Sequence, residues 1–373
     1  MTPSRRRCWP VPVALASLIV LAAAVALAQP PSEGRIPLAG AKRVKIAAFG
    51  RISVGASGAG DSIQYRWVGT PASLATKSSG GWRVISAART RTGPAPGELR
   101  VTLPDSLAQT FVGSDQGAVI VRGLDGALEV VTLSGNIEIR DVRGSVSART
   151  GGGEMTFSSI GGSLHSLSGG GSIRVDSAQG ETVLQTAGGD IVVGRVRGAL
   201  RASTAGNIKV NDAASTVEVF TQGGLIEVLR ARGVVTAENG GGSIVIGSAP
   251  GVHAESAGGG IRLKSVSGPV RARTTSGPIV ASFARNATIA SSFLSSGAGD
   301  VTVYLPSNTV VTVKALNESI GWRGGIVSDF TELRSQQPAS GFGALFAEGN
   351  LNGGGPQLML SVSRGSIFVK RAR

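Results

Sequence analysis

Residues able to do chemistry are few in this sequence, and most of them are basic. Lys and Arg number 37 against 23 Asp and Glu, which gives a net charge of +14. Three arginines recur in one context, each directly before a glycine: Arg143, Arg197 and Arg232. Arginines that line one surface attract anionic polymers and lipid head groups, so these three are the candidate anion-binding surface. The alternative is an ordinary solvated basic surface.

The usual catalytic and metal-binding patterns are missing. The sequence has no G-x-S-x-G nucleophile motif and no G-x-x-x-x-G-K-[ST] phosphate loop. His165 and His253 are the two histidines, and they are too far apart in the repeat described below to bind one metal ion. We therefore expect no catalytic residue, no cofactor and no metal. Nucleic acid is not expected as a partner either, because basic residues are not interleaved with aromatic ones.

The elements that must position these residues come from an internal repeat. Glycines occur every nine residues from Gly117 to Gly198, and the frame continues with two one-residue slips to Gly277. Alternate glycines of this series are followed by two different sequence patterns, so the repeat unit has about 18 residues. One half reads like residues 135–139, GNIEI, and the other like residues 144–148, GSVSA. Apolar residues two apart are typical of a strand with one buried face, and helical spacing fits nowhere in this region.

Such short strands cannot bury an apolar face alone, so successive copies must stack. We therefore predict an all-β fold in which one chain winds into a β-solenoid (β-helix) with about 18 residues per coil. Right-handed winding is favoured by the crossover rule.

One position of the repeat is polar throughout. We expect these side chains to form a ladder that satisfies backbone groups at the corners, where glycine supplies positive φ. The alternative is an array of hydroxyls on a ligand surface, or a nucleophile. The column consists of Thr132, Thr150, Ser168, Thr186, Thr204, Thr221, Asn239, Ser256 and Thr274.

Two other functions of stacked β-repeats can be compared with the sequence. Calcium-binding nonapeptides need an Asp in each turn, and the corresponding stretches, residues 152–156 and 188–192, lack the G-G-x-G-x-D pattern. Polysaccharide lyases and hydrolases need clustered carboxylates on neighbouring coils. Glu154, Glu181 and Asp190 fall on two faces, and we expect no acid pair on adjacent coils.

The N-terminus predicts export. Arg5, Arg6 and Arg7 precede an apolar stretch over residues 11–27, and residues 26–28, ALA, form a small-x-small cleavage site. Residues 1–28 are thus predicted to be a signal peptide. An uncleaved anchor is the alternative and the only route by which we expect membrane association. Cleavage would remove Cys8, the one cysteine, and leave a charge of 34 − 23 = +11. The expected location is the periplasm, the outer cell surface or the extracellular space.

The repeat is flanked by segments that should cover its open ends. Residues 29–45 are predicted to be a linker, residues 46–112 an N-terminal β cap, residues 113–283 the solenoid repeats and residues 284–373 a C-terminal β cap. Trp67, Trp82 and Trp322 lie in these flanks, where bulky side chains can cap a stack. A tryptophan-lined binding site is the alternative.

The repeats over residues 117–281 resemble those of a bacterial "putative adhesin" family of unknown function. The Leu-Pro endings of residues 101–104, VTLP, and 303–306, VYLP, also match, as do residues 349–354, 358–360 and 365–370 at the C-terminus. The resemblance covers roughly residues 46–373 and implies a β-strand-repeat protein of the cell envelope, with no catalytic residues.

We therefore predict an exported, non-enzymatic β-solenoid of the cell envelope, an adhesin or scaffold that binds an anionic polymer or surface. Its expected partners are anionic polysaccharide or envelope lipid head groups. The alternative is a polysaccharide-active β-helix enzyme, either a lyase or a hydrolase.

Overall fold

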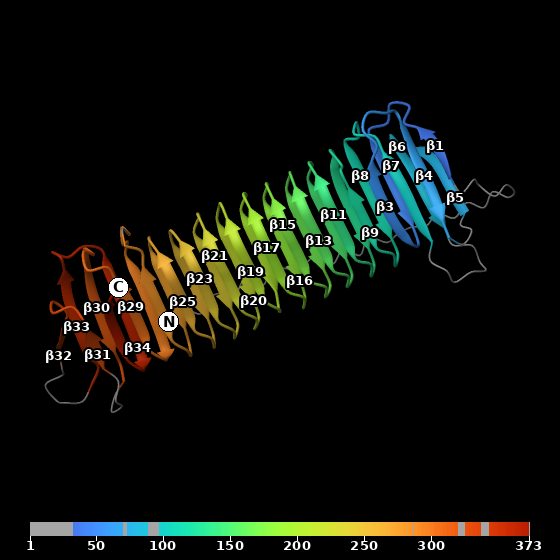
Figure 1. Cartoon of the computed structure of the whole chain (residues 1–373). Helices are drawn as coiled ribbons and strands as arrows, with labels where there is room; N and C mark the ends of the chain where they lie inside the picture. The colour runs from blue at the N-terminus through green and yellow to red at the C-terminus, as the bar shows by residue number, and fades with distance from the viewer. Residues whose placement is uncertain are drawn as a thin grey trace.

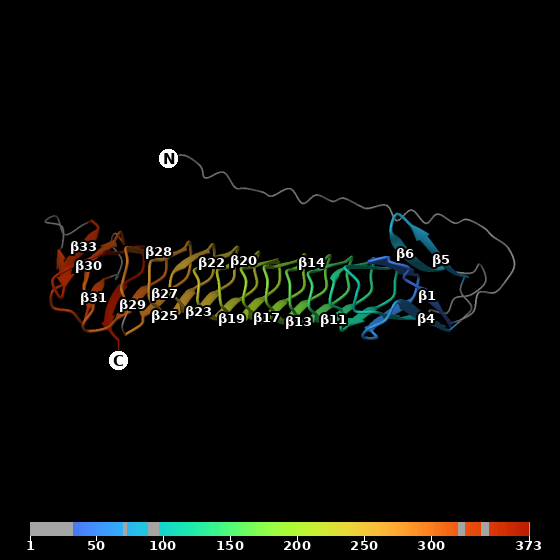
Figure 2. The same ribbon diagram turned by 90° about the horizontal axis from the view of Figure 1, so that it is seen from above.

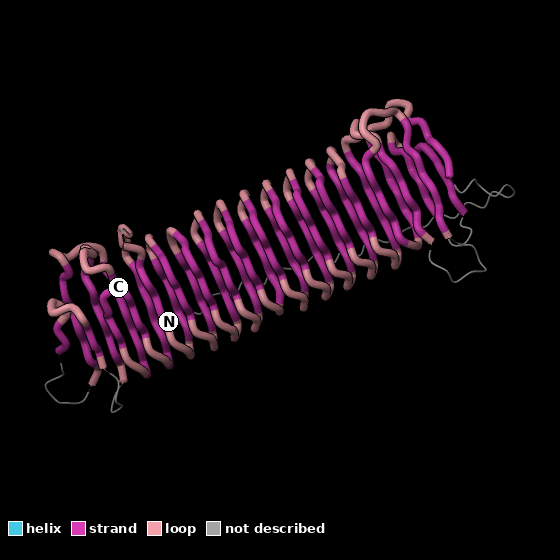
Figure 3. The backbone as a smooth tube through the Cα atoms, viewed as in Figure 1, coloured by secondary structure: helices cyan, strands magenta, loops and turns pink. Residues whose placement is uncertain are grey.

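The protein is a long rod made of β-strands (Figure 1). The computed structural model describes residues 33–69, 73–88, 97–285, 287–319, 325–336 and 343–372, so the predicted signal peptide lies outside the described residues. Within these ranges the chain forms strands, turns and loops and no helix, as the tube in Figure 3 shows. No helix that could cross a membrane occurs in this part of the chain.

The strands form two layers that run the length of the rod (Figure 2). Successive strands of the repeat alternate between the layers, which we call sheet A and sheet B. The repeat strands of sheet A are β9 (Val119–Arg122), β11 (Ile137–Val142), β13 (Met155–Ile160), β15 (Ile173–Ala178), β17 (Ile191–Val196), β19 (Ile208–Ala213), β21 (Ile226–Ala231), β23 (Ile244–Ala249), β25 (Ile261–Val266) and β27 (Ile279–Phe283). Those of sheet B are β8 (Gln109–Ser114), β10 (Ala127–Thr132), β12 (Val146–Thr150), β14 (Leu164–Ser168), β16 (Thr182–Thr186), β18 (Leu200–Thr204), β20 (Val217–Thr221), β22 (Val235–Asn239), β24 (Val252–Ser256) and β26 (Val270–Thr274).

Each strand pairs in parallel with the equivalent strand of the next repeat. Ile137 is opposite Met155 in sheet A, and Val146 is opposite Leu164 in sheet B. This register places like residues in columns, as the repeat predicted. The all-β class and the stacking of parallel strands, as in a β-solenoid, are therefore confirmed.

The apolar columns face one another between the sheets and form a continuous core. Ile191 and Val193 of sheet A are fully buried, as are Ala237 and Ala254 of sheet B. Side chains between them on each strand point outward, so the strands alternate buried and partly or fully exposed residues. The alternation that identified the strands in the sequence is the alternation between core and solvent.

The glycines that mark the repeat are needed because the backbones of neighbouring coils approach closely there. A Cβ at Gly135 would fall on the carbonyl oxygen of Gly117, and one at Gly153 would fall on that of Gly135. Neither glycine has a positive φ. Our expectation that glycine supplies positive φ at these corners was therefore wrong for most of the column. Gly277 is an exception, with φ +123°.

The N-terminal cap does not follow chain order. It contains β1 (Glu33–Pro37), β2 (Arg43–Ala48), β3 (Arg51–Ala56), β4 (Ser62–Val68), β5 (Ser73–Ser79), β6 (Trp82–Ala88) and β7 (Glu98–Leu103). In sheet B, β2 lies between β6 and β8, and in sheet A, β3 lies between β7 and β9. The chain thus places its first coil inside the stack and adds the coil of β6 and β7 outside it. The antiparallel strands β1, β4 and β5 then cover the end.

The segment 29–45, predicted to be a linker, therefore contains β1 and the first residues of β2. The sequence did not predict β1, because this strand is short, follows a Pro-rich stretch and has no apolar pattern of its own. It is held in the sheet by pairing with β4. Trp67 is buried in this cap beside Phe49, with ring centroids 5.3 Å apart. Trp82 lies under the Arg43 guanidinium. Trp322 lies outside the described residues.

The C-terminal cap is also interleaved. It contains β28 (Ser292–Ala298), β29 (Val301–Leu305), β30 (Val311–Asn317), β31 (Ile326–Ser328), β32 (Arg334–Gln336), β33 (Leu345–Leu351), β34 (Gln357–Arg364) and β35 (Ile367–Arg371). The last strands return into the stack: β34 lies between β28 and β30, and β35 lies between β29 and β31. The antiparallel strands β33 and β32 then cover sheet B.

Candidate anion-binding surface

The three predicted arginines lie in one column at the corner that follows the sheet A strands. Their backbone N–H groups each donate to the residue before the same corner one coil earlier: Arg143 to Leu124, Arg197 to Ala178 and Arg232 to Ala213. Two coils without a charge at this position separate Arg143 from Arg197, and one separates Arg197 from Arg232. At about 4.8 Å per coil, these intervals are about 14 Å and 10 Å.

The three arginines differ in their partners. The Arg143 guanidinium lies 2.9 Å from both carboxylate oxygens of Asp125 on the preceding coil. Arg197 and Arg232 are exposed and make no ion pair within the described residues. The structure therefore places all three on one corner, where Arg143 is paired and Arg197 and Arg232 are not.

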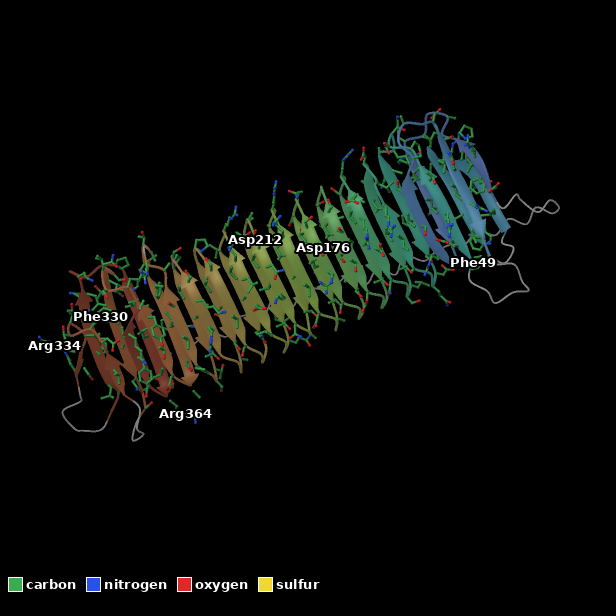
Figure 4. All side chains as sticks on the ribbon, viewed as in Figure 1. Phe49, Asp176, Asp212, Phe330, Arg334 and Arg364 are labelled. Atoms are coloured by element: carbon green, nitrogen blue, oxygen red, sulfur yellow. The ribbon has the colours of Figure 1, made fainter. Side chains whose placement is uncertain are left out.

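Some other charged residues on the outside of the sheets pair with a neighbour on the same or the next strand. Arg140 contacts Glu138 at 2.8 Å, Arg201 contacts Glu218 at 2.8 Å, and Lys209 contacts Glu227 at 3.0 Å. The side chains in Figure 4, with Asp176 and Asp212 among them, cover the outside of the rod along its whole length. Such exposed pairs contribute little to stability, but they remove charge from the surface. Arg197 and Arg232 make no such pair within the described residues, and the same holds for other exposed arginines of the sheets, such as Arg262 and Arg271.

The polar column is buried and fully used by the backbone. Thr150 donates to the carbonyl of Gly135 at 3.0 Å and accepts the N–H of Gly153 at 3.1 Å. The same pair of bonds recurs at Thr204, with the carbonyl of Gly189 and the N–H of Gly206. Asn239 makes both bonds with its amide group. The interpretation as a structural ladder is confirmed, because these side chains are buried and hydrogen-bonded to the backbone.

The two histidines lie in the same outward-facing row of sheet B, on β14 and β24. They are separated by the four intervening strands, so they share no site. The His253 ring nitrogen Nε2 lies 3.1 Å from a carboxylate oxygen of Glu255, two residues along the same strand. Among the described residues, no group of three or more His, Cys, Asp or Glu could hold a metal ion.

One pair of acids escaped the sequence analysis. Glu238 and Glu255 are directly opposite each other on the neighbouring strands β22 and β24, and both point outward. Our expectation that no two acids meet on adjacent coils was therefore wrong here. The register of the repeat already implied the match, because Glu238 and Glu255 directly precede Asn239 and Ser256, which belong to the same polar column. Arg273 follows in the same row on β26, directly opposite Glu255.

The clearest perturbation of a titratable group lies in the N-terminal cap. Hydrogen bonds from the Arg100 guanidinium, at 2.8 and 2.9 Å, are the main reason that the pKa of Glu98 is lowered. Partial burial opposes this shift, and the Ser53 hydroxyl, which donates to Glu98 at 2.6 Å, adds to it. This cluster ties β3 to β7, the two strands that are adjacent in space but not in sequence.

Comparisons with known proteins give distant structural neighbours, among them two described as adhesion proteins. No family model matches the chain, and no curated protein does. A protein described as a putative adhesin, from Bacteroides fragilis, is 17% identical, with a TM-score of 0.27 over 73% of this chain and 94% of that one. A protein described as a putative cell adhesion protein, from Clostridium sporogenes, is 8% identical, with a TM-score of 0.18 over 91% of this chain and 99% of that one. Both names agree with the resemblance of the repeats, but TM-scores this low carry no argument about function.

Proposed function

We propose that the protein is an exported, non-enzymatic β-solenoid of the cell envelope, an adhesin or scaffold that binds an anionic polymer. The predicted signal peptide supports export to the periplasm, the cell surface or the medium. The proposal includes right-handed coils of about 18 residues, and the pairing of Ile137 with Met155 supports the coil length.

One observation carries the binding role: Arg197 and Arg232 are exposed on one corner of a rod, about 10 Å apart, without an ion pair in the described part of the chain. The rod holds the two cations at a fixed interval, so a long anion can contact both without further ordering of the protein. Repeated weak contacts of this kind add by avidity and need no deep pocket.

The test is retention on an immobilised anionic polysaccharide at low salt and at about 0.5 M salt. Exposed charges are screened at high salt, so the parent should be retained at low salt and released at high salt. The double variant Arg197→Ser/Arg232→Ser should elute markedly earlier at low salt.

Arg143→Ser is the matched control, because Arg143 lies in the same column but already pairs with Asp125. Its single substitution should change retention less than Arg197→Ser does. The triple variant should behave like the double variant. Equal retention of the parent and the triple variant at every salt concentration would remove the corner arginines from the proposal.

The Glu238 and Glu255 pair is the one observation that favours the enzyme alternative. In-register neighbours are about 4.8 Å apart in the backbone, which is near the carboxylate separation of about 5 Å in retaining glycosidases. However, Glu255 already contacts His253, so its carboxylate is partly engaged. Purified protein should release no reducing or unsaturated ends from polyuronates or host glycans. If the parent did turn over such a substrate and Glu255→Gln abolished the turnover, the protein would be an enzyme instead.

A further inference from the structure

A shallow groove crosses the outer face of sheet B toward the C-terminal end of the rod. Its volume is about 420 Å³, and it runs across the beginnings of β24, β26, β28 and β34, which are neighbours in the sheet. We call it the sheet B groove. Because the strands lie across the rod, a groove that crosses them runs along the rod axis, in the direction of a bound linear chain.

The groove forms where the repeat becomes irregular. The corner between β11 and β12 has three residues, 143–145, whereas the connection between β27 and β28 spans residues 284–291. Ser291, at the end of this longer connection, lines the groove, and Gln357 lines it where β34 returns into the stack. The interleaved C-terminal cap therefore creates a surface that the regular coils do not have.

The row that forms the floor combines a cation with apolar surface. His253, Arg271, Phe293 and Met359 are opposite one another in register on the four strands. Arg271 is exposed and has no ion pair within the described residues. Phe293 is half-buried and Met359 is 44% exposed, whereas Met155, the other methionine of the described residues, is buried.

The Phe293 ring contacts Arg273, which lies in the neighbouring outward-facing row of sheet B. The Arg273 guanidinium lies over the Phe293 ring, 5.0 Å from its centroid, so one face of the ring is already covered by a cation. Arg271 and Phe293 are on adjacent strands, which brings an unpaired guanidinium beside apolar surface. A guanidinium binds a carboxylate through two parallel hydrogen bonds, and a sugar ring presents an apolar C–H face that packs on such surface.

Negative charge does not line the sheet B groove. Glu255 lies in the neighbouring row and contacts His253, and Glu238 lies beyond it on β22. A second groove of about 200 Å³ occupies the same rows nearer the N-terminus, but there Glu129 takes part in the lining and no arginine does. We therefore expect an anionic ligand to bind the sheet B groove in preference to the second, smaller groove.

We propose that the sheet B groove binds a segment of an acidic saccharide, a chain of uronate sugars. The sugar ring packs on Phe293 and Met359, and its carboxylate pairs with Arg271. This deepens the proposed function, since it assumes that the protein binds anionic polymers, and it names their class. It also adds a site separate from the corner arginines: the groove lies on a sheet face and contributes apolar contact, which salt does not screen.

The test uses a short oligogalacturonate, measured by isothermal titration calorimetry with the full-length mature protein at low and at about 0.5 M salt. The parent should bind it at both salt concentrations, and the neutral methyl ester of the same oligosaccharide should bind at least tenfold more weakly. Arg271→Gln should weaken binding of the acid at least tenfold. Phe293→Ala should weaken binding of both the acid and the ester.

Arg262→Gln is the matched control, because Arg262 is an exposed arginine on β25, in the other sheet. It should leave the affinity unchanged. Thermal melting checks that Phe293→Ala folds, and the exposed Arg271 provides a variant that does not disturb the core. If Arg271→Gln and Arg262→Gln bound the oligosaccharide equally, or if acid and ester bound with equal affinity, the groove assignment would be wrong.

Failure of this proposal differs from failure of the proposed function. Loss of oligosaccharide binding in Arg271→Gln, with polymer retention still dependent on Arg197 and Arg232, supports two separate sites. If the polymer retained the protein but the protein did not bind the oligosaccharide, the groove proposal would be wrong and the proposed role of the corner arginines would stand. If the protein neither bound the oligosaccharide nor was retained on the polymer, the proposed binding function would be wrong.

Discussion

The hydroxyl of Thr150 donates a hydrogen bond to the carbonyl of Gly135, which belongs to the preceding coil, at 3.0 Å. The same oxygen accepts the N–H of Gly153 within its own coil. One small side chain therefore joins two coils and satisfies a backbone donor and acceptor that the strands leave unpaired. Ser114 makes the same contact with Gly50, and Asn317 with Gly365, so the ladder continues into both caps.

Thr150→Val should lower the free energy of unfolding by about 1–3 kcal/mol, because it keeps the shape but leaves two buried backbone groups unsatisfied. Thr156→Val is the control, since Thr156 is a strand residue that faces outward. It should change stability by less than about 0.5 kcal/mol. Chemical denaturation of both variants checks the difference, and equal midpoints would mean that the ladder bonds contribute nothing.

Gly153→Ala should destabilise the protein by about 1–3 kcal/mol, because its Cβ would meet the Gly135 carbonyl oxygen and force the coils apart. Gly152→Ala is a control one residue away, since nothing lies within 4 Å of a Cβ there. It should be neutral or slightly stabilising. Thermal melting compares the two variants. If Gly153→Ala and Gly152→Ala melted at the same temperature, glycine would not be required at position 153.

The repeat could be predicted from the sequence because it is local and repeated many times. Period 2 identified the strands, and the nine-residue spacing of glycines identified the register that places Ile173 opposite Ile191. The physical reason for the glycines could not be predicted, because crowding by the preceding coil depends on backbone distances. Two further features were missed. The Glu238 and Glu255 pair was implied by the register of the repeat and overlooked, whereas the sheet B groove depends on the return of β34 into the stack, which no local pattern indicates.

Ile191→Asp should destabilise the protein by several kcal/mol, because it buries an unpaired carboxylate where Ile191 is fully buried. Val192→Asp provides the control, since Val192 is the next residue on β17 and faces outward. It should cost far less. Circular dichroism and thermal melting compare the two, and a parent-like melt of Ile191→Asp would contradict the register of the core.

Glu98→Gln should destabilise the N-terminal cap at neutral pH and have less effect in acid. The pKa of Glu98 is lowered from its ordinary value of 4.5, so the fold favours the charged form. That contribution is fully present above pH 4.5 and is lost as the pH falls through the lowered pKa. The difference in free energy of unfolding between parent and variant should therefore shrink below pH 4.5. A difference that stayed constant from pH 7 to acid would argue against the Arg100 contact.

The caps were predicted as strand-containing segments, but their topology was not. Leu103 and Leu305 each end a sheet A strand next to a proline, and both are fully buried at opposite ends of the rod. This equivalence was visible in the sequence as two Leu-Pro endings. The interleaving was not visible, because no local pattern indicates that residues 357–371 return between strands that precede them.

Removal of residues 357–373 should detach the C-terminal cap while the solenoid stays folded. The deletion takes away β34 and β35, which are the only links in the sheets between β28 and β30 and between β29 and β31 among the described strands. Leu358, Leu360 and Ile367 would leave the core, and β28 would become an exposed edge, so the variant should also associate more readily. Contacts in a stack are made between neighbouring coils, so the repeats over residues 117–283 should remain resistant to protease. Limited proteolysis with mass spectrometry should show new cleavage within residues 311–351, and removal of residues 1–28 should produce none. Continued protection of residues 311–351 would mean that β30 and β33 do not depend on the returning strands.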